Sequence, residues 1–510
     1  MSSIFSFSIE TWILLGTFLT LMILYGIWPY GVFTKRNIPG PWPVPFLGNI
    51  QEYSQGLMVF DKKCSEKYGK IWGLYEGRQA IIAVLDLDII KKVLVKEVFS
   101  SFTNRRNTGI EGILELAVSS AEDEHWKELR TLMSRTFTSG KLKEMLPIMT
   151  HYGEVLVRNI WRKAEKNENV TVKDYFGAYS LDVITSTSFG VDVDSLNKMN
   201  DTFVKEIKKI SSIDFFSPLF ALISTFPFMI PLLKLLNINL FPNDSVEYFK
   251  RFLHKVKERR HQDNQQHRVD FLQLMLDSQN PKEGSKGKGG SSSWKGLSDA
   301  ELLAQAFAFI FAGYETSSNT LSFISYNLAT HPDVQEKLQA EIDTVLPNKS
   351  PLTYDAIVQM EYLDMVINET LRLYPIGPRL ERMCKKTLEI NGLTIHKGTC
   401  VVIPIAVLQH DPNYWTEPDE FRPERFSKEM REKRDPYTFI PFGVGPRNCI
   451  GMRFALLNMK VAIIGLLQNF SLRTCQETQI PLELNSMGFL TPKKPIVLQF
   501  IPRADTKSQD

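Results

Sequence analysis

The stretch FGVGPRNCIG at residues 442–451 decides the fold of this 510-residue chain. Its glycine-rich loop delivers one cysteine, Cys449, to the start of an apolar helical segment, MRFALLNMKVAIIGLLQNF, at residues 452–470. Backbone N–H groups in a tight loop and at a helix N-terminus stabilise a thiolate and lower its pKa. The glycines allow the backbone to approach a flat bound group closely. The stretch therefore predicts an anionic sulfur at Cys449.

A buried structural cysteine in an ordinary glycine-rich turn is the alternative interpretation. Average residue frequencies put a chance match to Phe-x-x-Gly-x-Arg-x-Cys-x-Gly on the order of one in ten thousand for a chain of this length. The stretch resembles the haem-binding signature of the cytochrome P-450 superfamily. The resemblance implies that Cys449 is the axial ligand of the iron in haem b, that Phe442 packs beside the ring and that Arg447 neutralises a propionate.

Two motifs before this loop match the same superfamily. Glu369-Thr-Leu-Arg372 lies on an apolar-periodic helical pattern, and Arg425 follows within Pro-Glu-Arg-Phe. A Glu-x-x-Arg pair alone is weak support, because such ion pairs are more often solvated and contribute roughly a few tenths of a kcal/mol. Its position before the cysteine loop makes the pair informative. The resemblance implies a buried structural network of Glu369, Arg372 and Arg425.

Four arginines and a tryptophan are candidates for holding the haem propionates. Trp126 and Arg130 are four residues apart in WKELR, so on a helix they lie one turn apart on the same side. Arg105 in FTNRR and Arg382 in RLER match propionate-binding arginines of similar superfamily members. Together with Arg447, these residues would offset the negative charge that haem carries into the protein.

Residues 298–332 predict one unusually long helix. The run opens with a Ser-x-x-Glu capping box at Ser298 and Glu301, and it closes before a proline. A helix of about 33 residues spans roughly 50 Å. A helix so long and so apolar is expected to pass through the middle of the molecule.

The segment FAGYET within this helix corresponds to the oxygen-activation segment of the superfamily. Gly313 costs about 1 kcal/mol relative to alanine in a helix interior, which suits a local opening of the helix. The Thr316 hydroxyl can bond back to the Ala312 carbonyl or donate into the pocket, with Glu315 relaying protons from solvent. In the alternative, the Thr316 hydroxyl only bonds back to the backbone of its own helix, and Glu315 points to solvent. The resemblance implies that Thr316 and Glu315 are catalytic.

Runs such as FTSGKLKEMLPI and FGAYSLDVITSTSFGV resemble the vertebrate drug- and steroid-oxidising subfamily 3A, and the likeness covers essentially the whole chain. It implies a roomy pocket of broad specificity. The implied substrate contacts are Ser119, Ile213, Phe215, Leu219, Phe220, Phe241, Ala308, Phe311, Ala312, Thr316, Ile376, Gly377, Arg379 and Phe489. Relatives tend to have phenylalanine where this chain has Leu57, Thr108, Ile213 and Leu219, so we expect a thinner aromatic roof. For the apolar stripe at 213–231, core or membrane contact is an equal alternative.

Residues 11–34 carry no charge and are long enough to cross about 30 Å of hydrocarbon, which predicts a transmembrane helix. A cleaved secretory signal is the alternative, but no basic region precedes the segment and no small-residue cleavage site follows it. Lys35 and Arg36 follow the span and only Glu10 precedes it. The positive-inside rule therefore places the rest of the chain on the cytoplasmic face, which predicts a single-pass protein of the endoplasmic reticulum membrane.

The predicted fold is mainly α with small β-sheets. The resemblance implies the cytochrome P-450 fold, in which a long central helix lies over the haem, behind an N-terminal transmembrane helix. Apolar runs with strand character are short and are clearest at 81–85 and 399–405. The chain is expected to divide into a signal anchor (1–34), a proline-rich linker (35–60) and a catalytic domain (61–505). Five widely spaced cysteines indicate neither a disulfide framework nor a zinc ribbon.

A net charge of +3 without a dense basic stripe argues against a nucleic-acid partner. The resemblance implies a monooxygenase that inserts one oxygen atom from O2 into steroids, drugs and other lipophilic xenobiotics by hydroxylation or dealkylation. No Gly-x-Gly-x-x-Gly follows a strand pattern, so NADPH would act only through a separate NADPH-cytochrome P-450 reductase, with cytochrome b5 as an optional helper. Lys127, Arg130 and Arg453 can dock an acidic flavoprotein or can form a merely solvated face. The alternative functions are a haem-thiolate isomerase or synthase acting on an oxygenated lipid, and a non-catalytic haem-binding protein.

Overall fold

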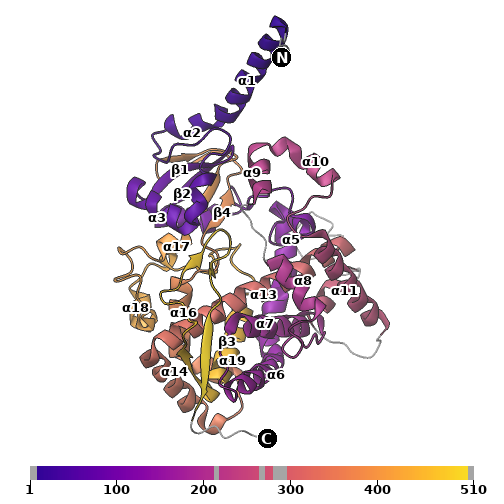
Figure 1. The fold of residues 1–510 in the computed structure, drawn as a ribbon, viewed down its shortest axis with the longest axis vertical. Coiled ribbons are helices and arrows are strands. Elements are labelled where there is room, and N and C mark those ends of the chain that lie inside the picture. Colours follow the sequence, from indigo (N-terminus) through magenta and orange to yellow (C-terminus); the bar gives the residue numbers. More distant parts are fainter. Residues whose placement is uncertain (1–7, 212–216, 263–269, 280–295, 504–510) are drawn as a thin grey trace, which may run out of the picture.

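The computed structural model describes residues 8–211, 217–262, 270–279 and 296–503, and helices dominate them (Figure 1). The helices are α1 (Ile9–Ile27), α2 (Gly31–Thr34), α3 (Leu57–Tyr68), α4 (Leu87–Lys91), the 3-10 helix η4 (Gly112–Leu116), α5 (Asp123–Ser134), α6 (Ser139–Ala164), α7 (Val172–Phe189), α8 (Thr202–Ser211), α9 (Pro218–Thr225), α10 (Ile230–Leu235), α11 (Asn243–Gln262), α12 (Phe271–Asp277), α13 (Asp299–Thr330), α14 (Pro332–Val345), α15 (Tyr354–Gln359), α16 (Glu361–Leu373), α17 (Ile405–Leu408), α18 (Lys428–Glu432) and α19 (Met452–Asn469). The strands are β1 (Ile71–Glu76), β2 (Gln79–Val84), β3 (Val170–Thr171), β4 (Leu380–Met383), β5 (Leu388–Ile390), β6 (Leu393–Ile395), β7 (Cys400–Ile403), β8 (Phe470–Thr474), β9 (Leu484–Asn485), β10 (Thr491–Pro492) and β11 (Val497–Pro502).

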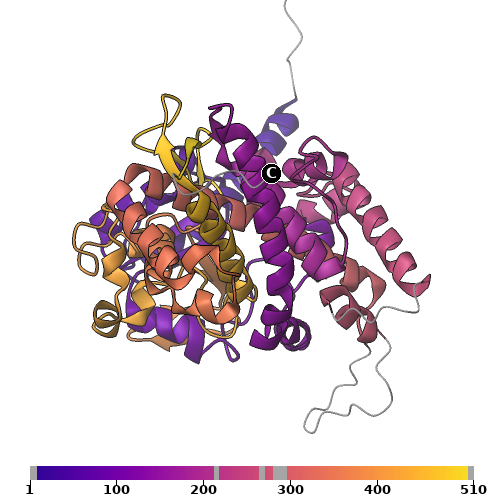
Figure 2. The ribbon, with the colours of Figure 1, turned by 90° about the horizontal axis from the view of Figure 1, so that it is seen from below.

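The long central helix is confirmed as α13. Ser298 caps it, and the predicted capping box with Glu301 is present. The helix passes through the middle of the body and packs against α7, α16 and α19 (Figures 1 and 2). Every residue from Ser317 to Ala329 is buried. This burial explains why the polar face of an ordinary surface helix is missing from the sequence.

The described residues also form four small sheets. The largest has the strand order β1-β2-β7-β4, in which β2 and β7 are parallel and the other neighbours are antiparallel. The two clearest strand predictions, at 81–85 and 399–405, correspond to β2 and β7. A second sheet has the order β3-β11-β8, and β5-β6 and β9-β10 form two-stranded pairs. The prediction of a mainly α fold with small sheets is therefore confirmed.

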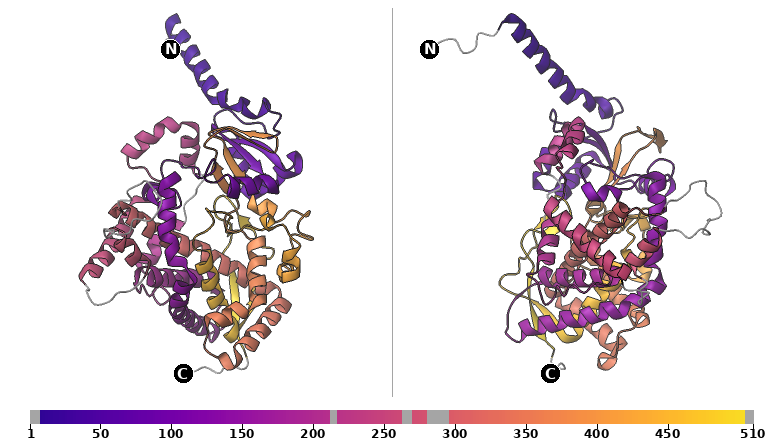
Figure 3. Two further views of the ribbon diagram at one scale, coloured as in Figure 1. Left: turned by 180° about the vertical axis from the view of Figure 1, so that it is seen from behind. Right: turned by 90° about the vertical axis from the view of Figure 1, so that its right-hand side faces the viewer.

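The chain forms one large helical core and a second core around the four-stranded sheet. The views from behind and from the side show the sheet at the same end of the body as α1, α9 and α10, with the C-terminus at the other end (Figure 3). The helical core contains the central part of α13, and the sheet core contains Leu380 of β4 and Ile405 of α17 among its members. Residues of both cores line one internal cavity.

The N-terminal helix α1 projects away from the body (Figures 1 and 3). Nearly all of its side chains are exposed, although they are apolar. Within the part of the chain that the structure describes, Ile9–Thr34 is the one unbent segment long and apolar enough to cross a membrane. An exposed apolar helix of this length agrees with the predicted membrane anchor.

The proline-rich segment at 35–60 packs on the first sheet. The Asn49 N–H donates to the Tyr75 carbonyl at 2.6 Å, and Tyr53 and Leu57 are buried in the sheet core. Its prolines explain the lack of helix at its start, because they remove backbone donors and fix φ. The division into anchor, linker and catalytic domain stays a prediction, but the linker is not a free spacer.

Candidate functional site

One internal cavity of about 530 Å³ brings most of the predicted site residues together. It lies among η4, α5, α13 and the loop before α19. The predicted residues that line it are Arg105, Ser119, Trp126, Arg130, Phe241, Ala308, Phe311, Ala312, Thr316, Ile376, Gly377, Phe442, Arg447, Cys449 and Phe489. They come from segments more than 300 residues apart, so only the folded chain creates this site.

Several predicted substrate contacts lie elsewhere. Leu219 packs in a small separate cluster with Ile110. The Arg106 guanidinium carbon lies over the Phe220 ring, 5.8 Å from the ring centre. Neither residue lines the cavity. The predictions for Ile213 and Phe215 fall outside the described residues. Of the predicted aromatic substrate contacts that the structure describes, Phe220 is therefore absent from the cavity wall, whereas Phe241, Phe311 and Phe489 line it.

Arg379 is also absent from the cavity wall, although it was expected to contact substrate. Its Nε and Nη2 atoms donate to both carboxylate oxygens of Asp61 at 2.6 Å, and its Nη1 lies 3.3 Å from Glu76. A guanidinium held by two buried carboxylates is not free to bind substrate. The structure therefore corrects this prediction: Arg379 ties α3 to the first sheet.

The loop that carries Cys449 is closed by backbone hydrogen bonds. The Cys449 N–H donates to the Phe442 carbonyl at 2.8 Å. Gly443 and Gly445 adopt φ values of +70° and +78°, which favour glycine. A Cβ atom at Gly445 would lie 2.1 Å from the Leu94 carbonyl oxygen, so this position has no room for a side chain. The loop thereby presents the Cys449 side chain to the cavity.

The chemistry of Cys449 depends on what occupies the cavity. Burial raises the pKa of its thiol, whereas the Gly451 N–H and the positive charges of Arg105 and Arg130 lower it. The Gly451 N–H therefore lowers the pKa of Cys449, as predicted for a backbone donor, but burial raises it by more. A metal ion bound to this sulfur would favour the thiolate, because a coordinating thiol is deprotonated.

Four guanidinium groups converge beside the cavity. Burial and, after it, the charge of Arg105 lower the pKa of Arg382 and of Arg447 to about 9. The Nε atoms of Arg382 and Arg447 are buried without a hydrogen-bond partner among the described residues. Uncompensated positive charges and orphaned donors require an anion. The two carboxylates of haem fit this cluster, and Arg105, Arg130, Arg382 and Arg447 would hold them.

Arg130 and Arg447 also hold the cysteine loop in place. Arg130 donates to the backbone carbonyl of Asn448 at 2.8 Å and to its Oδ1 atom at 2.7 Å. Arg447 donates to the Ser119 carbonyl at 3.3 Å and stacks over the Trp126 ring at 4.4 Å. These contacts join α5 to the residue before Cys449. This scaffolding role was not predicted from the sequence.

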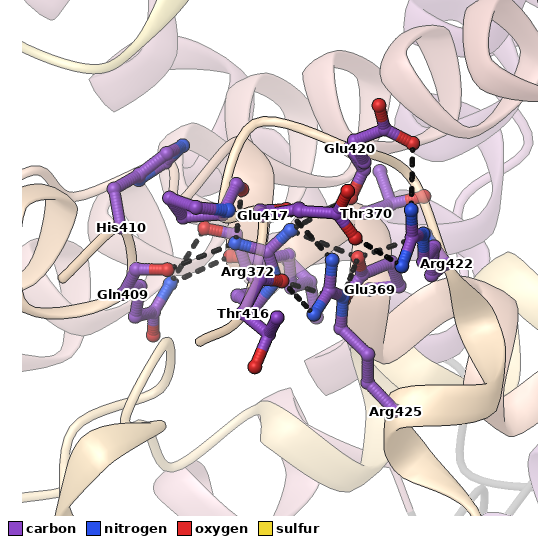
Figure 4. Close-up of polar contacts among 12 residues, drawn as sticks. Glu369, Thr370, Arg372, Gln409, His410, Thr416, Glu417, Glu420, Arg422 and Arg425 are labelled. Carbon is purple, nitrogen blue, oxygen red and sulfur yellow. Dashed lines mark hydrogen bonds and ion pairs between the residues drawn. The ribbon is translucent and has the colours of Figure 1, made fainter. Parts of the chain in front are cut away.

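The predicted Glu369, Arg372 and Arg425 residues form one buried network (Figure 4). Arg372 donates to the two Glu369 oxygens at 2.8 Å, and Arg425 Nε lies 3.2 Å from Glu369 Oε1. The side chains of Glu369 and Arg372 have no exposed surface. Their mutual bonds and the backbone carbonyls around Arg372 offset the cost of burying the charges.

Gln409 connects this network to the cysteine loop. Its Nε2 atom donates to the Leu371 and Arg372 carbonyls, and its Oε1 atom accepts from the Ile440 N–H at 3.2 Å. The Ile440 carbonyl in turn accepts from the Gly443 N–H at 2.9 Å. No local motif marks Gln409, so sequence reasoning missed it.

On α13, Thr316 lines the cavity and its hydroxyl donates to the Ala312 carbonyl at 2.7 Å. Gly313 also lines the cavity, and α13 runs unbroken through this position. A Cβ atom there would lie 2.9 Å from Ile184 Cγ1, so the glycine additionally permits close packing of α13 on α7.

Glu315 lies behind Thr316 and does not line the cavity. Only 3% of it is exposed, so it does not point to solvent. Its Oε1 atom accepts from Lys173 Nζ and from Asn319 Nδ2, both at 2.7 Å, while its Oε2 atom has no partner among the described residues. Lys173 is partly exposed and therefore links the buried carboxylate to the surface. No local motif marks Lys173, because it lies on α7, 142 residues before its partner Glu315 on α13.

The five cysteines are all free, and Cys449 is the one that lines the cavity. No group of three or more metal-ligating His, Cys, Asp or Glu residues exists among the described residues. A single cysteine can hold a metal only where another group supplies the other ligands, as a macrocycle does.

Comparison with known proteins agrees with this geometry. The family model for cytochrome P-450 matches residues 38–500. The chain is 58% identical over 501 residues to cytochrome P-450 3A5 of Homo sapiens, and the alignment covers 98% of both chains. It is 57% identical over 502 residues to cytochrome P-450 3A29 of Sus scrofa and 56% identical over 501 residues to cytochrome P-450 3A9 of Rattus norvegicus, again covering 98% of both chains.

Proposed function

Because this chain belongs to the cytochrome P-450 family, we propose that it is a haem-thiolate monooxygenase that oxidises steroids, drugs and other lipophilic molecules by hydroxylation and dealkylation. The observation that carries the proposal is the position of Cys449. Its side chain faces a largely apolar cavity beside four arginines that need an anion. Haem b satisfies both needs, because it brings iron for the sulfur and carboxylates for the guanidinium groups.

Haem held by Cys449 would supply the activation of O2, which the electron-rich sulfur of Cys449 would favour. The side chains of the cavity wall bind the substrate and limit the access of water. Phe311, Ile376 and Phe489 give the substrate an apolar wall and exclude water. One oxygen atom enters the substrate and the other leaves as water, which consumes two protons and two electrons. The Thr316 hydroxyl places a proton donor at the cavity wall, and Lys173 joins Glu315, the residue before Thr316 on α13, to the surface.

The electrons come from NADPH through a separate reductase in this proposal, and cytochrome b5 can assist. Basic residues near the cysteine loop support docking of an acidic flavoprotein there. Arg453 is exposed, and Lys127 is partly exposed and pairs with Glu124. Arg130 is occupied by Asn448, so it contributes less to a docking surface than its charge suggests. We also place α1 in the endoplasmic reticulum membrane, with the catalytic domain on the cytoplasmic face.

A reconstituted system tests this function. Purified protein with reductase, NADPH and isotopically labelled O2 is offered a panel of steroids and lipophilic drugs. We expect products that contain one labelled oxygen atom. Turnover of a peroxide substrate that never needs NADPH would instead indicate an isomerase or synthase. Ligand binding without any product would indicate a non-catalytic haem protein.

Changing Thr316 to alanine should separate oxygen consumption from product formation. The variant is expected to keep its haem but to release most reducing equivalents as hydrogen peroxide, with a roughly tenfold or greater loss of product per NADPH. The reason is that no other described residue places a hydroxyl at position 316 of α13, next to the carboxylate-bearing residue Glu315. The ratio of product to NADPH and the yield of peroxide measure the effect. Thr344→Ala is the control, because Thr344 makes the same bond to the carbonyl four residues before it, far from the cavity.

Changing Lys173 to methionine tests the proton route. Glu315 then loses its cation and its link to the surface, so we expect a severalfold slower turnover and a larger solvent deuterium isotope effect. Lys173→Arg should restore both values, because it keeps the charge. Lys208→Met is a matched control on α8, since Lys208 makes an exposed 2.7 Å pair with Asp174. An isotope effect that is identical in Lys173→Met and in the unchanged protein contradicts a route through Lys173.

A further inference from the structure

One acidic side chain lines the substrate cavity within the described residues. Glu111 stands at the start of η4, and every other lining residue is neutral or basic. The basic ones, Arg105, Arg130 and Arg447, lie with the cysteine loop, where the haem carboxylates would offset them. Glu111 therefore adds a negative charge to a wall that is otherwise made of apolar and small polar side chains.

The Glu111 carboxylate is held in a fixed position. Its Oε1 atom accepts from the backbone N–H and the hydroxyl of Thr108, at 2.5 and 2.8 Å. Its Oε2 atom accepts from the Gly109 N–H at 2.9 Å. A carboxylate offers about four acceptor sites, so one site on Oε2 remains for a further donor. The orienting hydroxyl belongs to Thr108, one of the positions where relatives were expected to have phenylalanine.

Glu111 also has no cationic partner among the described residues. Arg106, five residues before Glu111, pairs with Glu76 and Glu381. The charge of Glu111 is thus unmatched within the described part of the chain, whereas that of Glu115 in the next turn is neutralised by Lys234 at 2.9 Å.

The loop around Glu111 is anchored rather than free. The Glu115–Lys234 pair ties η4 to α10, and the Leu240 N–H donates to the Ile110 carbonyl at 2.8 Å. The end of η4 is fixed to α13, because Gln305 donates to the Leu116 carbonyl at 2.8 Å. A ligand group that meets Glu111 therefore meets a carboxylate whose position is set before binding, which reduces the entropy lost on binding.

We propose that Glu111 selects lipophilic substrates that carry a protonated amine, by accepting a charge-assisted hydrogen bond from that amine. This inference rests on the proposed function and names a substrate class for it. Few waters fit around a carboxylate once an apolar ligand fills the cavity, so an ammonium group compensates the charge better than a neutral group does. Neutral steroids of similar size would bind in the same cavity without this contact.

The alternative is that Glu111 only caps the turn at Thr108. Glu111→Gln separates the two roles, because glutamine keeps the size and one acceptor oxygen but removes the charge. Glu115→Gln is the matched control: it removes one negative charge from the same helix, but Glu115 does not line the cavity. Thr108→Val is a second variant that keeps the charge and removes the hydroxyl that orients it.

The experiment measures dissociation constants of the haem-loaded protein by equilibrium dialysis at neutral pH. The probes are a hindered lipophilic tertiary amine and its uncharged carbon isostere. We expect the unchanged protein to bind the amine about tenfold more tightly than the isostere, as one charge-assisted hydrogen bond allows. Glu111→Gln should abolish this preference, Thr108→Val should reduce it two- to threefold, and Glu115→Gln should leave it unchanged.

Two results overturn the inference. The first is an unchanged amine preference in Glu111→Gln, and the second is an equal loss in Glu115→Gln, which would indicate a general charge effect. In both cases the isostere still binds, so the proposed function stands. If neither probe binds to any protein, the lipophilic pocket itself is refuted, and the inference fails with it.

Discussion

Replacing Cys449 with alanine is expected to abolish thiolate ligation of haem and all monooxygenase activity. The other cysteines cannot substitute for it. Cys64, Cys384 and Cys400 are buried in the sheet core, and Cys475 follows β8. None of these four lines the cavity. The absorption spectrum of the reduced carbon monoxide complex reports directly on the atom opposite the gas, and it should lose the thiolate band completely.

Cys475→Ala is the matched control for this experiment. It removes a partly exposed thiol outside the cavity and should leave the spectrum and the activity unchanged. Burial raises the pKa of Cys64 to about 12, so Cys64 is no alternative source of a thiolate near neutral pH. A Cys449→Ala protein that keeps the thiolate band would show that another sulfur reaches the iron and would overturn the site.

Replacing Glu369 with glutamine should strongly destabilise the fold. Its carboxylate neutralises Arg372 and Arg425, and Arg372 has no exposed surface. Removing one partner of a buried ion pair leaves an uncompensated charge and costs about 3–5 kcal/mol. We expect a clearly lower urea midpoint by far-ultraviolet circular dichroism, together with loss of haem, because Gln409 connects this network to the cysteine loop.

Glu429→Gln provides the comparison. Glu429 and Lys433 form an exposed i, i+4 pair on the surface, so its loss should leave the urea midpoint unchanged within error. A Glu369→Gln protein that unfolds at the same urea concentration as Glu429→Gln would show that the buried network does not stabilise the fold. Retention of haem despite a lower midpoint would separate the network from the cysteine loop.

The features that the sequence predicted well are those whose signals are local. The glycine spacing around Cys449, the capping box at Ser298 and the i, i+3 pair of Glu369 and Arg372 each lie within a few residues. In the structure the loop, the start of α13 and the buried network all have the expected form. Local backbone preferences and short-range side-chain pairs decide these features, so they can be recognised before the fold is known.

The features that sequence reasoning missed depend on contacts between distant segments. Arg379 looked like a cavity residue because of its place in the chain, but Asp61 lies 318 residues away and binds its guanidinium. Gly313 lines the cavity as expected, but its close contact with Ile184 on α7 was not foreseen. Lys173 and Gln409 carry no motif at all. Such partners are set by how whole elements pack, and no local spacing encodes them.

The most direct test of iron ligation by Cys449 is X-ray absorption at the iron edge of the purified, haem-loaded protein. We expect one sulfur atom in the first coordination shell of the iron, and we expect this sulfur to be absent from Cys449→Ala. An iron atom with only nitrogen and oxygen neighbours in the unchanged protein would contradict the central claim that Cys449 holds the haem.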